Sequence, residues 1–522
     1  MTKYLINRIL RAIASVVIVV AVVMVMIYTF LNKQSIFATD AVFNKQQGNG
    51  KDVYMMQQWE RFGYLDYVPY ADYLQILVDE GTITADEMTE YSKIGDKASQ
   101  DTTKVSQYVE KFTEHYEAKG YKVIRLPAQT QGGGYKNGGQ PRLYAYKDVP
   151  LLTRLWNYLT GLITFDNIHY VKEDVGERGL TFTLYDPVYG GEKFSPAIMG
   201  NGTHHKYLVY FDNQFPYIHQ NLFKINLGVS YSVNKNIDVF DTMTSTQGTY
   251  VNSTVTYPSG VVKETGDDLH SATYLAGSQS VGELNPLLYV DDYTNVTTIK
   301  SGMSKMGYSF VIGIFSVILS YLLAVPMGIA MALKKDKFLD KLGTFYIIFI
   351  MAVPSLGYIF LFKSIGGKLG LPTTFDMQNP TTLMYILPIV SLALPSIASL
   401  MKWLRRYMID QMNSDYVKFA RSGGLSEGEI FSKHILKNAI IPIIHGIPAS
   451  VLGALTGAII TERVYVVPGV GNLLTTAINA YDNGVIVGVA LFYAVLSVTS
   501  VIMGDILMSM VDPRISFTSK AR

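Results

Sequence analysis

The chain has 522 residues, a formal net charge of only +2, and 49% hydrophobic residues, many of them gathered in long uninterrupted runs. This near-neutral balance argues against a general nucleic-acid-binding surface. The complete lack of cysteine excludes disulfide frameworks, thiolate metal sites and cysteine nucleophiles. Because several apolar runs are long enough to cross a bilayer, the composition predicts a membrane protein.

The first apolar run covers residues 12–31 and follows the basic residues Lys3, Arg8 and Arg11. A secretory signal would have a shorter apolar core and a cleavage site made of small residues. Here the run is long enough to span, and Tyr28, Thr29 and Phe30 stand where such a site would lie. Residues 1–31 are therefore predicted to form a cytoplasmic N-terminus and a first transmembrane helix.

Residues 32–300 contain no run that is long and apolar enough to span, so they are predicted to form a water-soluble domain of mixed α and β structure. Residues 84–87 have the form of a helix capping box, and residues 105–116 follow helical spacing up to Gly120. Residues 131–140 have the composition of a loop. Three stretches rich in β-branched and aromatic residues are predicted strands: 121–126, 206–211 and 249–262.

Residues 301–522 contain five further predicted spans, at 308–333, 342–362, 382–401, 442–462 and 484–510. Basic clusters follow the second, fourth and sixth spans: Lys334, Lys335 and Lys337; Lys402, Arg405 and Arg406; Arg514, Lys520 and Arg522. Since such clusters stay on the cytoplasmic side, both termini are expected in the cytosol and the 32–300 domain outside. Lys363 and Lys368 are the exceptions, because they fall on the external side.

The later spans are interrupted by proline and by small residues. Prolines lie within or at the ends of these spans at positions 326, 354, 388, 395, 442 and 448. Gly453 and Gly457 form a small-xxx-small pair, which favours close helix packing. These features suit a tightly packed bundle and equally suit movable helices that line a cavity. Ionisable Glu462, Arg463 and Asp505 are expected to form structural salt bridges, with gating as the second interpretation.

Several familiar catalytic patterns are absent or lie in the wrong context. Without a GxxxxGK[ST] loop, any ATP chemistry must come from a partner, and no HExxH string is present. His204, His205 and His219 lack the spacing and the carboxylate of a metal site. Residues 424–428 match GxSxG, but they lie in a charged loop and not after a strand. Residues 469–471 lack the third glycine of a dinucleotide fingerprint and are predicted to form a turn.

The polar segment at 402–441 is the most informative part of the chain. It holds seven Lys or Arg residues, four Asp or Glu residues and one histidine between two predicted spans. Residues 416–422 favour a helix that runs into Gly423 and Gly424, and a second helix is expected from Glu427 to Leu436. Gly424 is expected to supply a left-handed turn that a side chain would oppose. The prediction is a rigid corner of two short helices in the cytosol.

This segment resembles the EAA-type coupling motif of ABC importer permeases. Ala420 and Gly424 stand at its alanine-x3-glycine spacing, and Ile440-Ile441-Pro442 follows. Ser422-Gly423 departs from the Ala-Lys that relatives often have. The chain resembles dipeptide and oligopeptide permeases in particular. The stretches that carry this resemblance are residues 226–230, 405–410, 415–417, 420–421, 424–426, 434–438, 462, 468–471 and 512–515. The large external segment is similar to that of the first permease in Opp/Ami-type systems of Gram-positive bacteria, including residues 202–208 and 214–216.

The resemblance implies an α-helical polytopic membrane protein of the type I ABC importer permease class. Its six transmembrane helices would carry a large mixed α/β extracytoplasmic domain, inserted between helices 1 and 2. The chain would be a transporter subunit of the plasma membrane and not an enzyme, forming half of a translocation pathway for oligopeptides. Its expected partners are a second homologous permease, two cytosolic ATP-binding subunits, an extracellular peptide-binding lipoprotein, the peptide and the lipid bilayer.

The same resemblance implies that this chain binds no cofactor, because ATP and magnesium belong to the ATP-binding subunits. The residues expected to couple to those subunits are Asp415, Tyr416, Ala420, Arg421, Gly424, Leu425, Ser426, Glu427, His434, Asn438 and Pro442. Two alternatives stay open at this point. One is a membrane-tethered enzyme or sensor, and the other is a permease for nickel, haem or a sugar.

Overall fold

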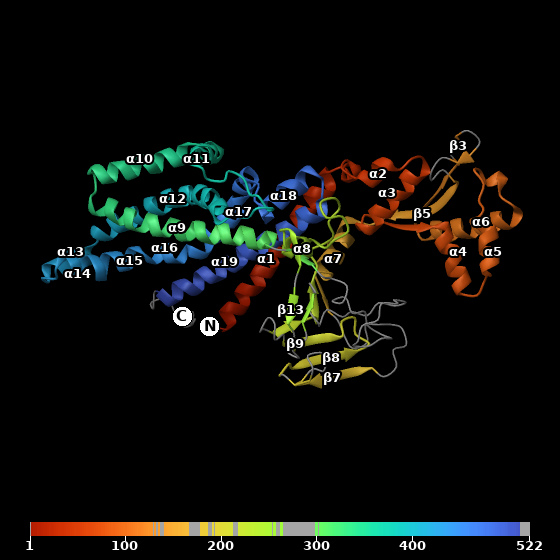
Figure 1. Ribbon diagram of the computed structural model, residues 1–522, viewed down its shortest axis with the longest axis horizontal. Helices are drawn as coiled ribbons and strands as arrows, with labels where there is room; N and C mark the ends of the chain where they lie inside the picture. Colours follow the sequence, from red (N-terminus) through yellow and green to blue (C-terminus); the bar gives the residue numbers. More distant parts are fainter. Residues whose placement is uncertain are drawn as a thin grey trace.

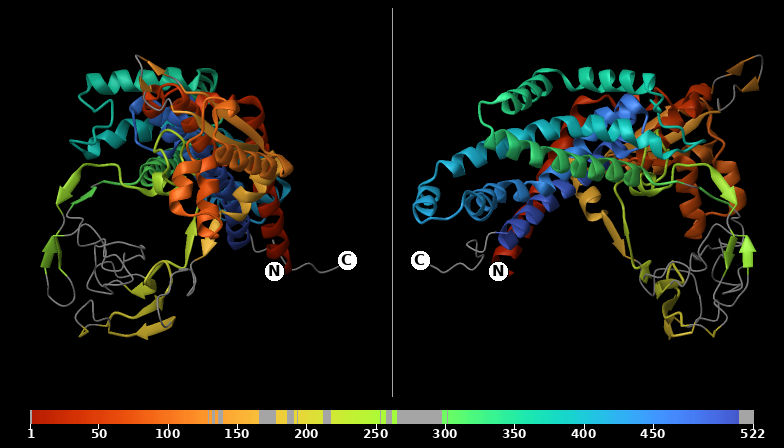
Figure 2. Two further views of the ribbon diagram at one scale, coloured as in Figure 1. Left: turned by 90° about the vertical axis from the view of Figure 1, so that its right-hand side faces the viewer. Right: turned by 60° about the vertical axis from the view of Figure 1, so that its left-hand side comes forward.

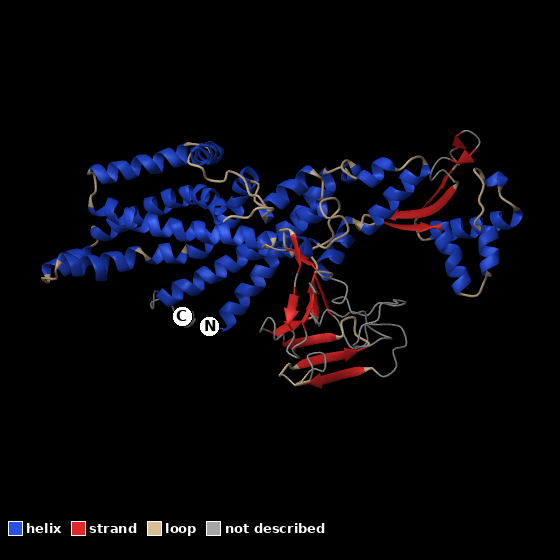
Figure 3. Ribbon diagram, viewed as in Figure 1, coloured by secondary structure: helices blue, strands red, loops and turns tan. Residues whose placement is uncertain are grey.

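The computed structural model describes residues 2–128, 130–131, 134–135, 140–165, 178–185, 191–192, 194–211, 218–252, 254–256, 262–264, 298–300 and 302–511. A bundle of long helices forms one end of the elongated molecule, and two lobes that contain the strands extend from the other (Figures 1 and 3). The two lobes leave the same end of the bundle in different directions (Figure 2). The basic cluster at 514–522 and the resemblance stretches 214–216 and 512–515 lie outside the described residues.

Five helices in the described part of the chain are long and apolar enough to cross a membrane, and each coincides with a predicted span. They are α1 (Thr2–Phe30), α9 (Lys305–Leu333), α12 (Ile386–Met412), α17 (Ile447–Tyr465) and α19 (Asn483–Val511). Prolines 326 and 395 lie inside α9 and α12 without ending them. Small buried residues, including Ala324, Ala393 and Ala398, let these two helices pack together along their length.

The predicted span at 342–362 is not one helix, and this expectation needs correction. The chain forms α10 (Phe338–Ala352) and α11 (Ser355–Lys368), with a bend of 110° between them. Pro354 explains the break, because proline disfavours helical geometry at the preceding residue. Val353 accordingly has an extended conformation, with φ −83° and ψ 129°. Counting this bent pair as one span brings the number of candidate spans to six.

The close helix packing predicted for the small-residue pair in α17 is not seen at its first member, Gly453. A Cβ atom added to Gly453 would meet no atom within 4 Å among the described residues. Closer backbone approaches occur elsewhere in the bundle. For example, a Cβ at Gly328 of α9 would lie 3.2 Å from the Cβ of Leu404 of α12.

The first lobe combines short helices with a three-stranded antiparallel sheet of order β1-β5-β2. Its sequence predictions are confirmed by the Thr84–Glu87 capping box, by the helix that precedes Gly120, and by strand β2. Phe112 and Leu74 are fully buried in its core. The elements are α2 (Ala41–Lys45), α3 (Asn49–Arg61), β1 (Leu65–Pro69), α4 (Tyr70–Asp79), α5 (Ala85–Tyr91), α6 (Thr103–Ala118), β2 (Lys122–Leu126), β3 (Thr130–Gln131), β4 (Gly134–Tyr135) and β5 (Arg142–Asp148). Most of the predicted loop at 131–140 lies outside the described residues.

The second lobe contains a four-stranded antiparallel sheet of order β10-β9-β8-β7. The strand predicted at 206–211 is confirmed as β9, whereas the one predicted at 249–262 is divided among shorter strands. The strands are β6 (Ile163–Phe165), β7 (Gly179–Thr183), β8 (Ala197–Asn201), β9 (Tyr207–Phe211), β10 (Ile218–Gln220), β11 (Phe223–Ile225), β12 (Tyr250–Asn252), β13 (Thr254–Thr256), β14 (Val262–Glu264) and β15 (Thr298–Lys300). Helices α7 (Leu151–Thr160) and α8 (Val239–Thr244) lie where the lobes meet the bundle (Figure 1).

Candidate functional site

Residues 415–442, here called the projecting segment, stand at the tip of the bundle farthest from the lobes (Figure 1). The segment contains α13 (Asp415–Ser422), α14 (Glu427–Glu429), the π-helical turn η6 (Ile430–Leu436) and α15 (Lys437–Ala439). It then enters α16 (Ile441–His445), where Pro442 occupies the first turn, a position that needs no backbone N–H donor.

The corner between the two arms of the segment has the predicted geometry. Gly423 ends α13 by donating its N–H to the carbonyl of Phe419 at 2.9 Å. Gly424 follows with a φ of +82°, so the predicted left-handed turn is confirmed. Ser426 then starts the second arm through a capping box, because its hydroxyl accepts the N–H of Glu429 at 3.3 Å while the Glu429 carboxylate accepts from Ser426.

The second helix expected from Glu427 to Leu436 is present, and it widens after Glu429 into the π-helical turn η6. Ile430 and Ile435 are both buried although they stand five residues apart. The wider π turn brings both side chains toward the bundle, which an α-helical turn would not do. The second helix expected from Glu427 is therefore confirmed, with a π-helical turn that the sequence did not indicate.

An apolar cluster fixes both arms of the projecting segment to the long helices. Val417 and Ile430 from the segment are fully buried against Ala332 of α9 and against Leu404 and Met408 of α12. Burying each such side chain contributes about 1.5–3 kcal/mol. Both arms of the segment are therefore attached to α9 and α12.

Tyr416 connects the two arms through its hydroxyl group. It donates to the backbone carbonyl of His434 at 3.3 Å and accepts from the amide of Asn438 at 3.0 Å. The side-chain oxygen of Gln411 is a second acceptor for the single hydroxyl proton, which it shares with the His434 carbonyl. Three residues that the sequence singled out, Tyr416, His434 and Asn438, are thus brought together.

Charged pairs lie on the outer surface of the projecting segment. The Arg421 side chain crosses the corner and donates two hydrogen bonds to the Glu427 carboxylate, from Nε at 2.6 Å and from Nη2 at 3.0 Å. This hydrogen bonding lowers the pKa of Glu427. Asp415 pairs with Lys418 at 2.9 Å. Because these ion pairs are exposed to solvent, they orient the charged side chains on the surface but contribute little to the stability of the segment.

The tip also exposes two apolar side chains: Leu425, which the resemblance had indicated, and Phe419, which the sequence analysis did not identify. Phe419 is 78% exposed and Leu425 is 40% exposed, on either side of the corner at Gly424. Ala420 is half-buried between them, and its carbonyl accepts the N–H of Leu425 at 3.2 Å. The available signal was that Phe419 stands two positions after the buried Val417, so a helix directs them to different faces. A large exposed aromatic group in such a place indicates a contact surface.

An ion pair with a buried carboxylate joins the helices next to the segment. Asp340 of α10 accepts from Arg405 of α12 through two parallel hydrogen bonds of 2.6 and 2.7 Å. This bidentate geometry is the strong form of the interaction. Arg405, predicted as part of a cytoplasmic basic cluster, therefore also joins two helices.

The salt bridges predicted for the ionisable residues of the last two long helices are confirmed in one case and wrong in two. The salt bridge expected for Asp505 is confirmed, because Arg8 lies 2.5 Å from it. The salt bridges expected for Glu462 and Arg463 are wrong. Glu462 is fully buried and accepts hydrogen bonds from the Ser309 hydroxyl at 2.6 Å and from the backbone of Asn472 at 2.9 Å. Arg463 donates to the side chain of Asn472 at 3.3 Å.

The burial of Glu462 explains another correction. The turn predicted at 469–471 ends at Gly469, and helix α18 (Val470–Asn479) begins at the next residue. A Cβ atom at Gly469 would lie 2.3 Å from the Glu462 carboxylate, and one at Gly471 would lie 2.6 Å from Ile459. These glycines are therefore needed for close packing around Glu462.

A second buried carboxylate, Asp482, was not identified from the sequence. It lies between α18 and α19 and joins them to the segment before α8. The Ser230 hydroxyl donates to it at 2.6 Å, as do the backbone N–H groups of residues 231, 232 and 233 at 2.8–2.9 Å. Beside it, Gly484 approaches so closely that an added Cβ would lie 1.9 Å from the Val229 carbonyl oxygen. The segment at residues 229–233 is thus attached to the start of α19.

In the part of the chain that the structure describes, no group of three or more His, Asp or Glu residues is arranged to hold a metal ion. The arrangement of the projecting segment is instead that of a rigid contact surface attached to two long helices.

Comparisons with known proteins agree with the resemblance in the sequence. Residues 324–517 match the family described as "Binding-protein-dependent transport system inner membrane component". Over 527 aligned residues, which cover 100% of this chain and 99% of the relative, the chain is 32% identical to the oligopeptide transport system permease protein AmiC of Streptococcus pneumoniae serotype 4. It is 33% identical over 226 residues to the dipeptide transport system permease protein DppB of Lactococcus lactis subsp. cremoris, covering 43% of this chain and 73% of that one.

Among solved structures, the chain is similar to the MetNI methionine ABC transporter in an inward-facing conformation. The sequence identity is 11%, the TM-score is 0.34, and the match covers 40% of this chain and 94% of that one. Most of the present chain lies outside this match.

Proposed function

The chain belongs to the family of binding-protein-dependent transport permeases of the Opp/Ami type, and from this premise we propose that its projecting segment couples a peptide pathway to ATP-binding subunits. As a permease component of this family, the chain is a multi-pass membrane protein of a peptide importer and not its catalytic subunit. ATP and magnesium act in partner subunits, and this chain contributes half of the translocation pathway.

The proposed orientation puts the projecting segment and both termini in the cytosol, with residues 32–300 outside the cell. Its support is the charge distribution. Lys334, Lys335 and Lys337 follow α9 directly, and the chain reaches the segment through the basic end of α12. Basic residues of this kind remain on the cytoplasmic side. The lobes then lie at the entrance of the pathway, where an external peptide-binding lipoprotein would deliver its cargo.

The main support for the proposal is that the projecting segment exposes an apolar side chain at its tip while other side chains of the same segment are buried against the bundle. Phe419 offers an apolar contact to a cytosolic partner, while Val417 and Ile430 attach the same segment to α9 and α12. When ATP closes a pair of ATP-binding subunits, the segment moves with them and the two helices follow. ATP binding drives this change only because it favours one arrangement of the helices over the other.

Replacing Phe419 with alanine tests this contact. We expect Phe419→Ala to weaken association with the ATP-binding subunits by about 2 kcal/mol, or roughly 30-fold, as for an aromatic anchor in an interface. Peptide uptake should fall in parallel. The measurements are titration of the ATP-binding subunits onto the full-length chain in nanodiscs and uptake of labelled peptide by cells.

Phe338→Ala is the matched control, because Phe338 is 80% exposed at the start of α10 and lies outside the projecting segment. It should leave association and uptake unchanged. Normal association in Phe419→Ala would refute the proposed contact. Uptake of nickel, haem or a sugar in place of peptide would refute the proposed cargo and leave the coupling intact.

The importer is proposed to contain, besides this chain, a second homologous permease, two ATP-binding subunits and the external lipoprotein. Co-purification of the intact complex from membranes, followed by identification of its subunits, tests this composition.

A further inference from the structure

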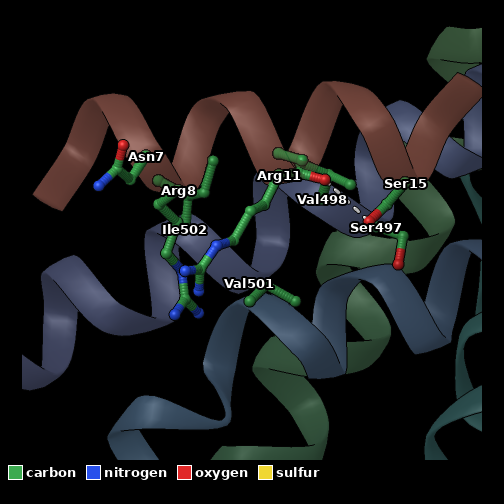
Figure 4. A pocket seen from close by; sticks show the side chains of 9 residues that line it. Asn7, Arg8, Arg11, Ser15, Ser497, Val498, Val501 and Ile502 are labelled. Carbon is green, nitrogen blue, oxygen red and sulfur yellow. Dashed lines mark hydrogen bonds between the residues drawn. The ribbon is translucent and has the colours of Figure 1, made fainter.

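A cavity of about 340 Å³ lies between α1 and α19, near the N-terminus of α1. Figure 4 shows its lining from close by. The α1 side contributes Asn7, Arg8, Arg11, Ala12 and Ser15, and the α19 side contributes Ser497, Val498, Val501 and Ile502. No step of the proposed transport mechanism uses this cavity.

Two arginines occupy one end of the cavity. The side chains of Arg8 and Arg11 extend from successive turns of α1 toward the same space, with their guanidinium groups close together (Figure 4). Arg8 is paired with Asp505 of α19 at 2.5 Å. Arg11 forms no ion pair with any residue that the structure describes. Arg11 stands directly before the apolar run at 12–31, at the edge of the membrane, where a basic side chain attracts anionic headgroups.

Apolar side chains form the wall of the cavity between the arginines and the two serines, Ser15 and Ser497, at its other end (Figure 4). Ala12, Val498, Val501 and Ile502 form this wall, and Val501 is 50% exposed. The neighbouring outer face of α1 also exposes apolar side chains, including Ile13 and Ile18. A basic end followed by an apolar wall matches a phosphate group that is followed by an acyl chain.

We propose that this cavity binds an anionic phospholipid of the cytoplasmic leaflet. Arg11, assisted by Asn7, holds the phosphate, since a guanidinium group binds phosphate oxygens through two parallel hydrogen bonds. The first part of an acyl chain lies along Val498, Val501 and Ile502. The lipid thereby holds α1 against α19. The inference goes beyond the proposed transport function and uses only its placement of the N-terminus in the cytosol.

The experiment compares lipid retention by the full-length chain and by Arg11→Gln. Each protein is reconstituted in nanodiscs that contain phosphatidylglycerol and phosphatidylcholine, released, and examined by native mass spectrometry. The wild-type chain should retain one phosphatidylglycerol that Arg11→Gln binds about fivefold more weakly, the usual effect of one basic side chain near an anionic surface. Lys334→Gln is the matched control, since Lys334 is an exposed basic residue at the end of α9, outside the cavity, and should retain the lipid.

Two further arms decide between sources of the phosphate group. Val501→Phe fills part of the cavity along its apolar wall without changing any charge and should also reduce retention of phosphatidylglycerol. Inorganic phosphate, added to the chain in pure phosphatidylcholine nanodiscs, should leave its thermal unfolding unchanged. Equal retention by wild type and Arg11→Gln, equal retention of phosphatidylcholine, or stabilisation by inorganic phosphate alone would each overturn the lipid assignment.

Discussion

Asp482 illustrates how much a single residue contributes to this architecture. Its carboxylate is fully buried and accepts from a hydroxyl group and from three successive backbone N–H groups at residues 231–233. Hydrogen bonds to a charged acceptor are worth more than neutral ones, and buried donors that lose their acceptor are costly. One side chain therefore orders a backbone segment that would otherwise have no regular partner.

Asp482→Ala should release this segment locally. Leaving the N–H groups of residues 231–233 without an acceptor should cost about 3 kcal/mol, because each buried unsatisfied donor costs about 1–3 kcal/mol. Hydrogen exchange of these amides should accelerate by about 100-fold, as measured by mass spectrometry on the reconstituted chain. Asp241→Ala is the control, since Asp241 forms an exposed ion pair with Lys224. Unchanged exchange in Asp482→Ala would contradict the role given to this carboxylate.

Asp40 predicts a response to pH in the first lobe. Burial raises the pKa of Asp40, but hydrogen bonds from Lys235, from the Phe43 backbone and from Tyr54 outweigh it, so the pKa lies below its usual value of 3.8. The folded state therefore favours the carboxylate. Its stabilising contribution is complete above that usual value and is lost as the pH falls through the lower, folded-state pKa.

The fluorescence of Trp59 reports this transition, because Trp59 lies in the apolar cluster next to α2. In a chain whose other tryptophans, Trp156 and Trp403, are replaced by phenylalanine, the signal should stay constant from pH 7 to pH 5. It should change only below about pH 4. Asp40→Asn should lack this acid step and show the altered signal already at pH 7. A step at the same pH in Asp40→Asn would assign the transition to other groups.

At the scale of elements, the sequence predicted what depends on local pattern. Long apolar runs gave the boundaries of α9 and α19 to within a few residues, and Gly424 was correctly assigned a left-handed turn. The break at Pro354 was harder to predict from the sequence, because Pro326 and Pro395 lie within continuous helices. Whether a proline bends or breaks a helix depends on partners for the freed backbone groups, which come from other parts of the fold.

The same limit explains the other differences at this scale. Helix α18 follows a glycine-rich stretch whose purpose is to make room for the buried Glu462. The π-helical turn depends on the burial of both Ile430 and Ile435 against α12. Neither contact has a local signature in the sequence. In the projecting segment, Tyr416, His434 and Asn438 could be named from the resemblance, but their mutual hydrogen bonds required the structure.

The corner of the projecting segment allows a prediction with an internal control. Gly424→Ala must adopt a left-handed conformation and should cost about 1–2 kcal/mol locally, although no neighbouring atom lies within 4 Å. Gly424→Asp should do the same and weaken both the docking of ATP-binding subunits and peptide uptake. Gly428→Ala, four residues later in helical geometry and equally open, should be neutral or slightly stabilising. Titration of ATP-binding subunits and uptake assays measure both effects, and equal behaviour of the alanine variants at Gly424 and Gly428 would contradict the argument.

At the scale of the whole molecule, the sequence predicted one external domain of mixed α and β structure between the first two spans. The structure divides residues 32–300 into two lobes, and the described part of each lobe has its own apolar clusters. This division depends on which distant strands pair, as in the β1-β5-β2 sheet. Pairing of strands far apart in the sequence leaves no local pattern to read.

The four-stranded sheet of the second lobe should be removable as a unit. Strands β6 and β11 pair in antiparallel register, with Phe165 opposite Phe223, so the two residues that flank 166–222 lie side by side. Replacing these residues by an Asn-Gly turn should leave the bundle and the first lobe folded. Membrane insertion and the thermal unfolding temperature of the chain should stay close to those of the wild type. If the external lipoprotein docks on this lobe, its binding should be lost while the ATP-binding subunits still associate. Failure of the shortened chain to insert would show that the lobes are not independent.

The carboxylate at Asp482 also has a consequence for the order in which the chain is made. Ser230 leaves the ribosome 252 residues before the side chain that it binds. With residues 32–300 outside the cell, as proposed, the segment that contains Ser230 crosses the membrane and stays without its acceptor until Asp482 has been synthesised.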